Sequence, residues 1–260
     1  MYTLGIDIGS TTSKCVILKD GAEVIAKSLV QAGTGTKGPK QAFDEVLGKA
    51  GLTREDMDYV MATGYGRNTY EEADGEMSEL SCHAKGVFFG NPDCRTIIDI
   101  GGQDAKVISL GERGNISNFV MNDKCAAGTG RFLDVMANIL QLGVDELETY
   151  ARKADAPVKI SSTCTVFAES EVISQLSKNV ELSNLIAGIC NSVASRVTAL
   201  AKRVGVKDKV CMSGGVAQNG GVLDALSREL KTEVVAVADA QYMGALGAAI
   251  AGYEKAGNSR

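Results

Sequence analysis

The motif DIGSTTSK, Asp7–Lys14, returns later in the chain as DIGGQDAK, Asp99–Lys106. Each copy ends an apolar strand pattern with an aspartate and a glycine, and a second strand, a turn and a third strand follow it. The same order of elements therefore occurs twice, starting near Tyr2 and near Arg95. An internal repeat of this kind predicts an α/β protein built from two similar lobes.

The rest of the chain alternates between strand and helix patterns, with Gly, Asp and Asn marking the turns. We expect the first lobe to span residues 1–92, with a C-terminal helix over 243–260 packing back on it, and the second lobe to span 93–242. The expected strands cover 2–8, 14–19, 23–30, 58–62, 95–100, 105–110, 116–121, 209–213 and 233–237. The expected helices cover 40–50, 77–89, 132–140, 144–154, 163–178, 183–204, 222–230 and 244–252.

The composition excludes several classes of protein. The chain has 260 residues, 45% of them hydrophobic, and a net charge of −5, so it lacks the basic surface of a nucleic-acid-binding protein. It contains no apolar run long enough to span a membrane. Its first residues enter a strand pattern directly, without the charged region and cleavage site of a signal peptide, so we expect a cytoplasmic protein.

Three glycine-rich turns follow strands, and the third is MSGGVAQN, Met212–Asn219. Ligands of α/β proteins bind at the carboxyl ends of strands, where all three turns fall. In the first turn the hydroxyls, glycine and lysine suit phosphate, and Asp7 suits Mg²⁺. One such turn alone is commonly only a turn, but the repeat favours a nucleotide site. Walker A and GxGxxG patterns are absent, which argues against P-loop and dinucleotide folds.

Two of the seven cysteines stand in similar surroundings, in NDKCAAGTGRFLDVMANILQ (122–141) and SSTCTVFAESEVISQL (161–176). We expect Cys125 to lie at or just ahead of one helix N-terminus and Cys164 at another, where a thiolate is stabilised. Two thiolates are too few for a [4Fe–4S] cluster, but a two-fold symmetric homodimer supplies four. The alternative is a pair of buried or capping cysteines. The other five cysteines fit packing roles, and the presence of a single histidine, His83, argues against a His-based catalytic site.

These motifs resemble those of a known superfamily. DIGSTTSK, DIGGQD and MSGGVAQN look like the two phosphate motifs and the adenosine motif of sugar kinases, actin and heat-shock ATPases. The resemblance implies two actin/hexokinase-like (ribonuclease-H-like) lobes with ATP in the cleft between them. Within that superfamily, the two cysteine segments are very similar to the activator component of 2-hydroxyacyl-CoA dehydratases. This iron–sulfur ATPase is related to the ATP-binding subunits of benzoyl-CoA reductase, and the resemblance covers essentially the whole chain.

The resemblance implies an ATPase that acts as a one-electron donor. A homodimer would share one [4Fe–4S] cluster, take an electron from reduced ferredoxin or flavodoxin, and pass it to a transiently bound dehydratase as ATP becomes ADP. Hydrolysis would change the angle between the two cluster-bearing helices. The implied residues are Asp7 and Asp99 for Mg²⁺; Ser10, Thr11, Thr12, Ser13, Lys14, Gly101 and Gly102 for phosphates; Gln103 or Asp104 for the attacking water; Gly214, Gly215 and Gln241 for adenosine; Asp145 or Glu146 for ribose; and Cys125 and Cys164 for the cluster.

Three other hypotheses remain at this point. An ATP-binding subunit of a benzoyl-CoA-reductase-type enzyme would work within a permanent hetero-oligomer. A small-molecule kinase would bind no iron, although the small second lobe lacks the insertions that usually form a sugar pocket. An actin-like filament protein has little support in the sequence. For Asp145 and Glu146, an exposed acidic helix start is an equally good interpretation.

Overall fold

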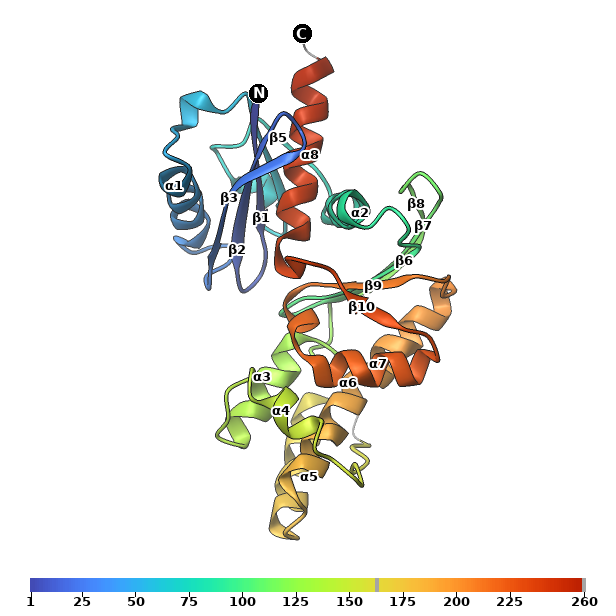
Figure 1. The fold of residues 1–260 in the computed structure, drawn as a ribbon. Coiled ribbons are helices and arrows are strands. Elements are labelled where there is room, and N and C mark those ends of the chain that lie inside the picture. The colour runs from blue at the N-terminus through green and yellow to red at the C-terminus, as the bar shows by residue number, and fades with distance from the viewer. Residues whose placement is uncertain (162–163, 259–260) are drawn as a thin grey trace. The chain divides into compact units, whose positions relative to one another are not determined.

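The computed structural model describes residues 1–161 and 164–258, which form two compact units (Figure 1). Unit 1 contains Met1–Asp93, Glu112–Ile116 and the chain from Gln241 onward. Unit 2 contains Cys94–Gly111 and Ser117–Ala240. Each unit is built around its own mixed β-sheet.

The sheet of unit 1 has five strands in the order β3-β2-β1-β4-β5. Strands β1, β2 and β3 form an antiparallel meander, whereas β1 and β4 are parallel, as are β4 and β5. The turn between β2 and β3 uses Asp20 and Gly21, both with positive φ, as expected for an Asp-Gly hairpin. The strands are β1 (Tyr2–Ile8), β2 (Ser13–Lys19), β3 (Glu23–Val30), β4 (Tyr59–Gly64) and β5 (Gly75–Glu76).

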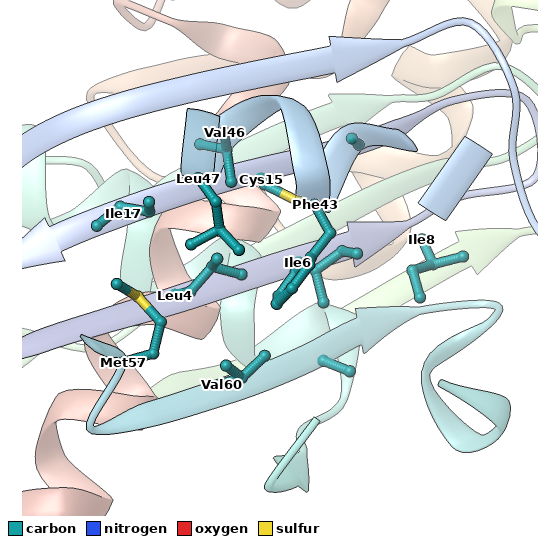
Figure 2. Close-up of a cluster of buried hydrophobic side chains, with 12 residues drawn as sticks. Leu4, Ile6, Ile8, Cys15, Ile17, Phe43, Val46, Leu47, Met57 and Val60 are labelled. Atoms are coloured by element: carbon teal, nitrogen blue, oxygen red, sulfur yellow. The ribbon is translucent and has the colours of Figure 1, made fainter. Parts of the chain in front are cut away.

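Helices cover both faces of this sheet. Helix α1 (Gly38–Ala50) packs on β2 and β3, and α8 (Met243–Asn258) packs on β1, β2 and β4 (Figure 1). Helix α2 (Glu79–Gly90) lies against α8. The core between the sheet and α1 is a layer of buried apolar side chains (Figure 2). It is formed by Leu4, Ile6, Ile8, Cys15, Ile17, Ala42, Phe43, Val46, Leu47, Met57, Val60 and Ala62.

The sheet of unit 2 also has five strands, in the order β10-β9-β6-β7-β8. Strands β6 and β7 are antiparallel, whereas β6 pairs with β9 and β9 with β10 in parallel. The antiparallel pair that carries each acidic turn therefore lies beside a parallel strand in both units, as the sequence repeat predicts. The strands are β6 (Thr96–Ile100), β7 (Ala105–Leu110), β8 (Ile116–Asn122), β9 (Val210–Ser213) and β10 (Val234–Ala236).

The helices of unit 2 are mostly those that the sequence predicts. Helix α6 packs on α4 and α7, and α3 packs on α5. The helix expected over 144–154 is wrong in length, because α4 covers only Leu147–Ala151. The helices are α3 (Gly130–Ile139), α4, α5 (Thr165–Ser177), α6 (Leu182–Val204) and α7 (Gly220–Leu230). No helix in the two described ranges is both long and apolar enough to cross a membrane.

Candidate functional site

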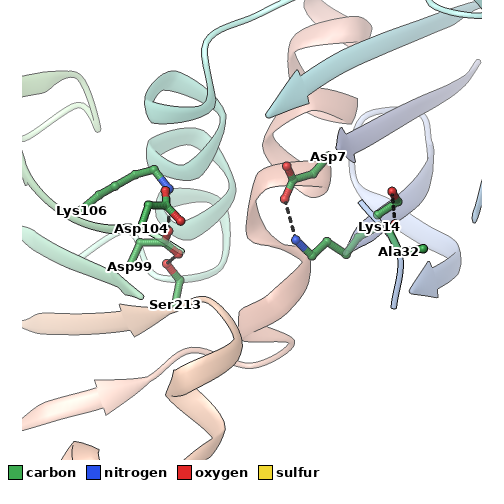
Figure 3. Close-up of polar contacts among 8 residues, drawn as sticks. Asp7, Lys14, Ala32, Asp99, Asp104, Lys106 and Ser213 are labelled. Atoms are coloured by element: carbon green, nitrogen blue, oxygen red, sulfur yellow. Dashed lines mark hydrogen bonds and ion pairs between the residues drawn. The ribbon is translucent and has the colours of Figure 1, made fainter. Parts of the chain in front are cut away.

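The acidic turn of unit 1 places an aspartate opposite a lysine. Asp7 of β1 pairs with Lys14 of β2 in the antiparallel register, and Lys14 Nζ lies 3.2 Å from Asp7 Oδ2 (Figure 3). The side chains of Lys14 and Asp7 are only 15% and 8% exposed. A carboxylate so far removed from water needs a counter-charge, which Lys14 supplies. Lys14 thus neutralises Asp7 in this structure.

The acidic turn of unit 2 repeats this arrangement. Asp99 of β6 pairs with Lys106 of β7, and Lys106 Nζ lies 3.2 Å from Asp99 Oδ2 (Figure 3). Lys106 also forms an ion pair with Asp104, and the Ser213 hydroxyl donates a 2.7 Å hydrogen bond to Asp99 Oδ1. Lys106 and Ser213 are absent from the predicted site residues. The position of Lys106 in DIGGQDAK, equivalent to that of Lys14, is the signal that would have found it.

The loop that follows Asp7 leaves some of its hydroxyls accessible. Thr11 is exposed, and Ser10 and Thr12 are half-buried. The Gly9 N–H donates to the Thr12 carbonyl at 3.0 Å, which closes the turn. Ser13 is fully buried, and its hydroxyl donates to the Ala32 carbonyl at 2.8 Å. The Ser13 hydroxyl therefore donates its proton within unit 1 and has none to donate to a phosphate oxygen.

In the loop that follows Asp99, the two residues predicted to orient water, Gln103 and Asp104, differ in their exposure. The Gly101 N–H donates to the Asp104 carbonyl at 2.9 Å, so this loop is a closed turn as well. Gln103 at its tip is exposed. Asp104 is 5% exposed and its carboxylate is paired with Lys106. The side-chain amide of Gln103 is thus accessible, whereas the Asp104 carboxylate is committed to an ion pair.

The third glycine turn packs against the end of β6. Gly214 has φ +85°, and its N–H donates to the Ala240 carbonyl at 2.9 Å. A Cβ at Gly214 would lie 3.0 Å from Asp99 Oδ1 and closer still to the Ile100 carbonyl. The turn therefore needs glycine both for its backbone conformation and for its contact with the Asp99 hairpin.

The remaining predicted nucleotide residues lie elsewhere in the chain. Gly215 begins the 3₁₀ helix Gly215–Gln218 directly after the third turn. Gln241 lies in the 3₁₀ helix Ala240–Tyr242, which precedes α8, and it is the first residue of the C-terminal segment of unit 1. Asp145 is exposed, two residues before α4. The structure thus gathers Gly214 and Gly215 near Asp99, and it gives Asp145 no fixed place in that cluster.

Burial separates the two predicted ligand cysteines from the rest. Cys125 and Cys164 are exposed, and the other five cysteines are buried. Loss of hydration in the interior raises the pKa of the Cys82 thiol to about 12 and the pKa of the Cys190 thiol to about 12. Buried thiols of this kind stay protonated near neutral pH and are poor ligands. Only Cys125 and Cys164 thus present their thiols at the surface.

The two cysteines differ in their relation to the helices that follow. Cys164 is the N-cap residue of α5, as expected. Cys125 lies just ahead of a helix, because α3 begins at Gly130 with Thr129 as its N-cap residue. Gly128, with φ +85°, turns the backbone away from a helical path between them. Cys125 therefore lies in the loop just ahead of the helix and not at its first turn.

This cysteine loop is hydrogen-bonded to the acidic turn of the same unit. The Gly130 N–H donates to the Gly101 carbonyl at 2.9 Å, and the Arg131 N–H donates to the Gly102 carbonyl at 2.7 Å. At the other end of the loop, the Asn122 amide donates to the Cys125 carbonyl at 2.8 Å. The first N–H groups of a helix lack partners within the helix. Here the acidic turn supplies those partners for α3.

The donor atoms suit the groups that the sequence suggests. Carboxylate oxygens of Asp7 and Asp99 are ligands that Mg²⁺ prefers. The described residues of one copy contain no group of three or more His, Cys, Asp or Glu side chains that could hold a metal ion. The two surface thiols of one copy would thus supply half of the four thiolates of a [4Fe–4S] cluster. The residues therefore fit a cluster shared by two copies.

The two sheets, each with an acidic hairpin beside a parallel strand, define the actin/hexokinase-like class of ATPase folds. The chain belongs to the BadF/BadG/BcrA/BcrD ATPase family, whose family model matches residues 4–252.

Two relatives resemble the chain over nearly its full length. It is 61% identical over 257 residues to the (R)-2-hydroxyglutaryl-CoA dehydratase activating ATPase of Acidaminococcus fermentans, covering 98% of each chain. It is 55% identical over 260 residues to the 2-hydroxyisocaproyl-CoA dehydratase activator of Clostridioides difficile, covering 100% of this chain and 98% of the relative. The solved structure of that activator, with bound ADPNP, matches 100% of this chain and 97% of its own with a TM-score of 0.97.

Proposed function

We propose that the chain is an ATP-dependent one-electron donor that activates a 2-hydroxyacyl-CoA dehydratase. The observation that carries the proposal is the exposure of Cys125 and Cys164, and of no other cysteine, in a unit that also holds the Asp99 turn. The relatives at 61% and 55% identity are dehydratase activators by name, which supports the same function.

In this proposal both acidic turns serve ATP. Asp7 and Asp99 hold Mg²⁺ directly or through water, and Lys14 and Lys106 neutralise and orient these carboxylates. The hydroxyls of Ser10, Thr11 and Thr12 and the backbone N–H of Gly102 contact phosphate oxygens. Gly101, whose N–H closes the turn onto the Asp104 carbonyl, lets the phosphate approach the backbone closely. Ser13 has a buried position and would support the loop rather than bind phosphate.

The remaining nucleotide roles follow from exposure and from the third turn. Gln103 orients the attacking water, since its amide is exposed while Asp104 is held by Lys106. Gly214 and Gly215 leave backbone open for the adenosine end, and Gln241 and Asp145 are further candidates for adenosine and ribose. The expected products of turnover are ADP and phosphate.

The cysteines give the electron-transfer half of the proposal. Cys125 and Cys164 from each of two copies would hold one [4Fe–4S] cluster, which supplies one-electron transfer when bound. Asn122 fixes the backbone of the Cys125 loop, and the Glu171 carboxylate accepts hydrogen bonds of 3.0 and 3.1 Å from the Ser161 N–H before Cys164. Each cysteine segment is thus held by a polar side chain of the same unit. The homodimer is part of this proposal.

A short chain of hydrogen bonds would couple the two halves. The Gly101 and Gly102 carbonyls accept from the first N–H groups of α3, the helix that follows the Cys125 loop. A shift of this turn when the nucleotide changes would move the start of α3 and the loop with it. This route lies wholly within unit 2.

Iron analysis and an activation assay test the proposal together. Protein purified without oxygen should contain about four irons per dimer. With ATP and a reductant (reduced ferredoxin, flavodoxin or dithionite), it should activate a 2-hydroxyacyl-CoA dehydratase. A Cys125→Ala, Cys164→Ala variant should lose iron and activation, whereas the buried control pair Cys82→Ala, Cys190→Ala should keep both. Retention of iron and activation by the first variant would refute the cluster assignment.

The same preparation separates the alternatives. A permanent hetero-oligomer on copurification would favour a benzoyl-CoA-reductase-type subunit over a free homodimer. Absence of iron after reconstitution, with a phosphorylated metabolite formed from ATP, would favour a small-molecule kinase. The expected result is a free dimer that contains iron and hydrolyses ATP.

A further inference from the structure

His83 lies in a part of unit 1 where two helices are in direct backbone contact. A Cβ on Gly247 of α8 would collide with the Cys82 carbonyl of α2, and a Cβ on Gly86 of α2 would collide with the Met243 carbonyl of α8. Such close contact requires glycine and leaves little freedom for the helices to shift. His83, between Cys82 and Gly86, is 7% exposed and therefore held in a rigid setting.

The N-terminal end of α8 opens onto both His83 and Asp7. A Cβ on Gly244 would lie 2.9 Å from Asp7 Oδ2 and 3.0 Å from His83 Nε2. The two side-chain atoms thus face the same small space, which is kept open because residue 244 has no side chain. On the other side of the carboxylate, a Cβ on Gly64 would lie 2.6 Å from Asp7 Oδ1. Glycines therefore border Asp7 on two sides.

Two sources of positive charge lie near the Asp7 carboxylate. Lys14 contributes an ammonium group at 3.2 Å, and the start of the 16-residue helix α8 contributes the partial positive charge of its free N–H groups. An N–H on Nε2 of the His83 ring would add a donor of fixed direction. Lys14 has a long flexible side chain, whereas His83 is held by the α2–α8 contact. His83 is therefore the better group to fix the direction in which the carboxylate points.

We propose that His83 is a positioning residue of the nucleotide site, which orients the Asp7 carboxylate for Mg²⁺ through the Nε2 side of its ring. This inference rests on the proposed role of Asp7 in Mg·nucleotide binding. His83 does not contact the nucleotide in this proposal, and it acts only through Asp7. Its loss should weaken the binding of Mg·ADP more than the binding of ADP without the metal.

Calorimetric titration of the 260-residue protein with ADP, once in the presence of Mg²⁺ and once in the presence of EDTA, tests this inference. His83→Leu keeps the size of the side chain without a donor, and His83→Gln restores an N–H. We expect His83→Leu to weaken Mg·ADP binding about tenfold, the size expected for a lost hydrogen bond to a charged group. His83→Gln should recover most of that loss, and ADP binding in EDTA should be the same in all three proteins.

A pair of glycine variants tests the same space independently. Gly244→Ala would fill it and should lower Mg·ADP affinity, whereas a Cβ on Gly252 of the same helix would meet its neighbours at no less than 3.4 Å and should change nothing. Equal Mg·ADP affinity in wild type and His83→Leu, or equal losses in His83→Leu and His83→Gln, would overturn the inference. A wild-type protein that fails to bind Mg·ADP would instead refute the proposed function.

Discussion

Lys106 Nζ lies 3.2 Å from Asp99 Oδ2 in unit 2, and the two side chains are only 3% and 2% exposed. The same ammonium group also pairs with Asp104, whose side chain is 7% exposed. In unit 1 the equivalent Lys14 is 15% exposed and pairs with Asp7. The two hairpins thus share one arrangement but differ in how completely the charges are buried.

Lys106→Met should destabilise the protein more than Lys14→Met. Loss of Lys106 leaves two buried carboxylates without their cation, which lowers the free energy of unfolding by about 3–5 kcal/mol. Loss of Lys14 leaves one carboxylate with partial access to water, so its effect should be smaller. Equilibrium unfolding in urea measures the loss of stability in each variant. Equal losses would contradict the conclusion that Lys106 neutralises two buried carboxylates, Asp99 and Asp104.

Gly214→Ala should impair nucleotide binding through the Asp99 hairpin. The new methyl group would crowd the Ile100 carbonyl and Asp99 Oδ1 at a residue with φ +85°. Gly205, with φ +84° and no atom within 4 Å of the place that a Cβ would take, is a matched control for the backbone strain alone. We expect Gly205→Ala to cost about 1 kcal/mol in stability with unchanged ADP affinity. Similar ADP affinities for the two variants would show that the crowding has no role.

The rate of alkylation should distinguish the two exposed cysteines from the five buried ones. In cluster-free protein at pH 8, iodoacetamide should modify Cys125 and Cys164, because the reagent can reach their exposed thiols. The five buried thiols should react only after unfolding. Mass spectrometry of tryptic peptides after increasing reaction times measures this, and rapid labelling of Cys82 in the folded protein would contradict it.

Alkaline pH should weaken the fold through its buried thiols. Burial raises the pKa of Cys190 to about 12 in the folded protein, from an ordinary value of 9.0. Its contribution to stability is therefore complete below about pH 9 and is lost as the pH rises from about 9 to 12. The free energy of unfolding of Cys190→Ala should fall less steeply over this range than that of wild type. Parallel curves would exclude this contribution.

The class of fold was predictable because the repeated acidic turns lie beside strong apolar strand patterns. Strand β5 was not, since Gly75–Glu76 has only two residues and no apolar run. Helix α4 was predicted too long, because a local turn competes with the helix: the Gly143 N–H donates to the Glu146 carboxylate at 2.7 Å. Strand β5 is too short to show a periodic pattern of apolar residues. The turn at Gly143 is too local to leave such a pattern.

The site residues were predictable where a motif repeats and not where a tertiary contact decides. The spacing from Asp99 to Lys106 matches that from Asp7 to Lys14, so the sequence already contains this pair. The hydrogen bond from Ser213 to Asp99 joins residues 114 positions apart, which no local pattern reveals. The position of Cys125 depends on the left-handed backbone at Gly128, which a glycine permits but does not require.

Gly130→Pro should uncouple the Cys125 loop from the acidic turn. Gly130 is the first residue of α3, a position at which proline is well tolerated in helices, so the helix itself should persist. Proline lacks the N–H that donates to the Gly101 carbonyl at 2.9 Å, so this contact is lost. In wild type, the alkylation rate of Cys125 in cluster-free protein should differ between ADP and ADPNP. In Gly130→Pro the two rates should converge.

Gly130→Ala is the control for size, because it keeps the N–H while adding a methyl group 3.1 Å from the Gly101 carbonyl oxygen. It should retain the difference between the two nucleotides, and far-UV circular dichroism should report unchanged helix content in both variants. If Gly130→Pro kept the wild-type ratio of alkylation rates, the signal would have to pass from the turn to the loop without this hydrogen bond. If both variants lost the difference between the ADP and ADPNP alkylation rates, crowding at residue 130 rather than the missing N–H would be the cause. Loss in Gly130→Pro alone therefore identifies the Gly130–Gly101 hydrogen bond as the link.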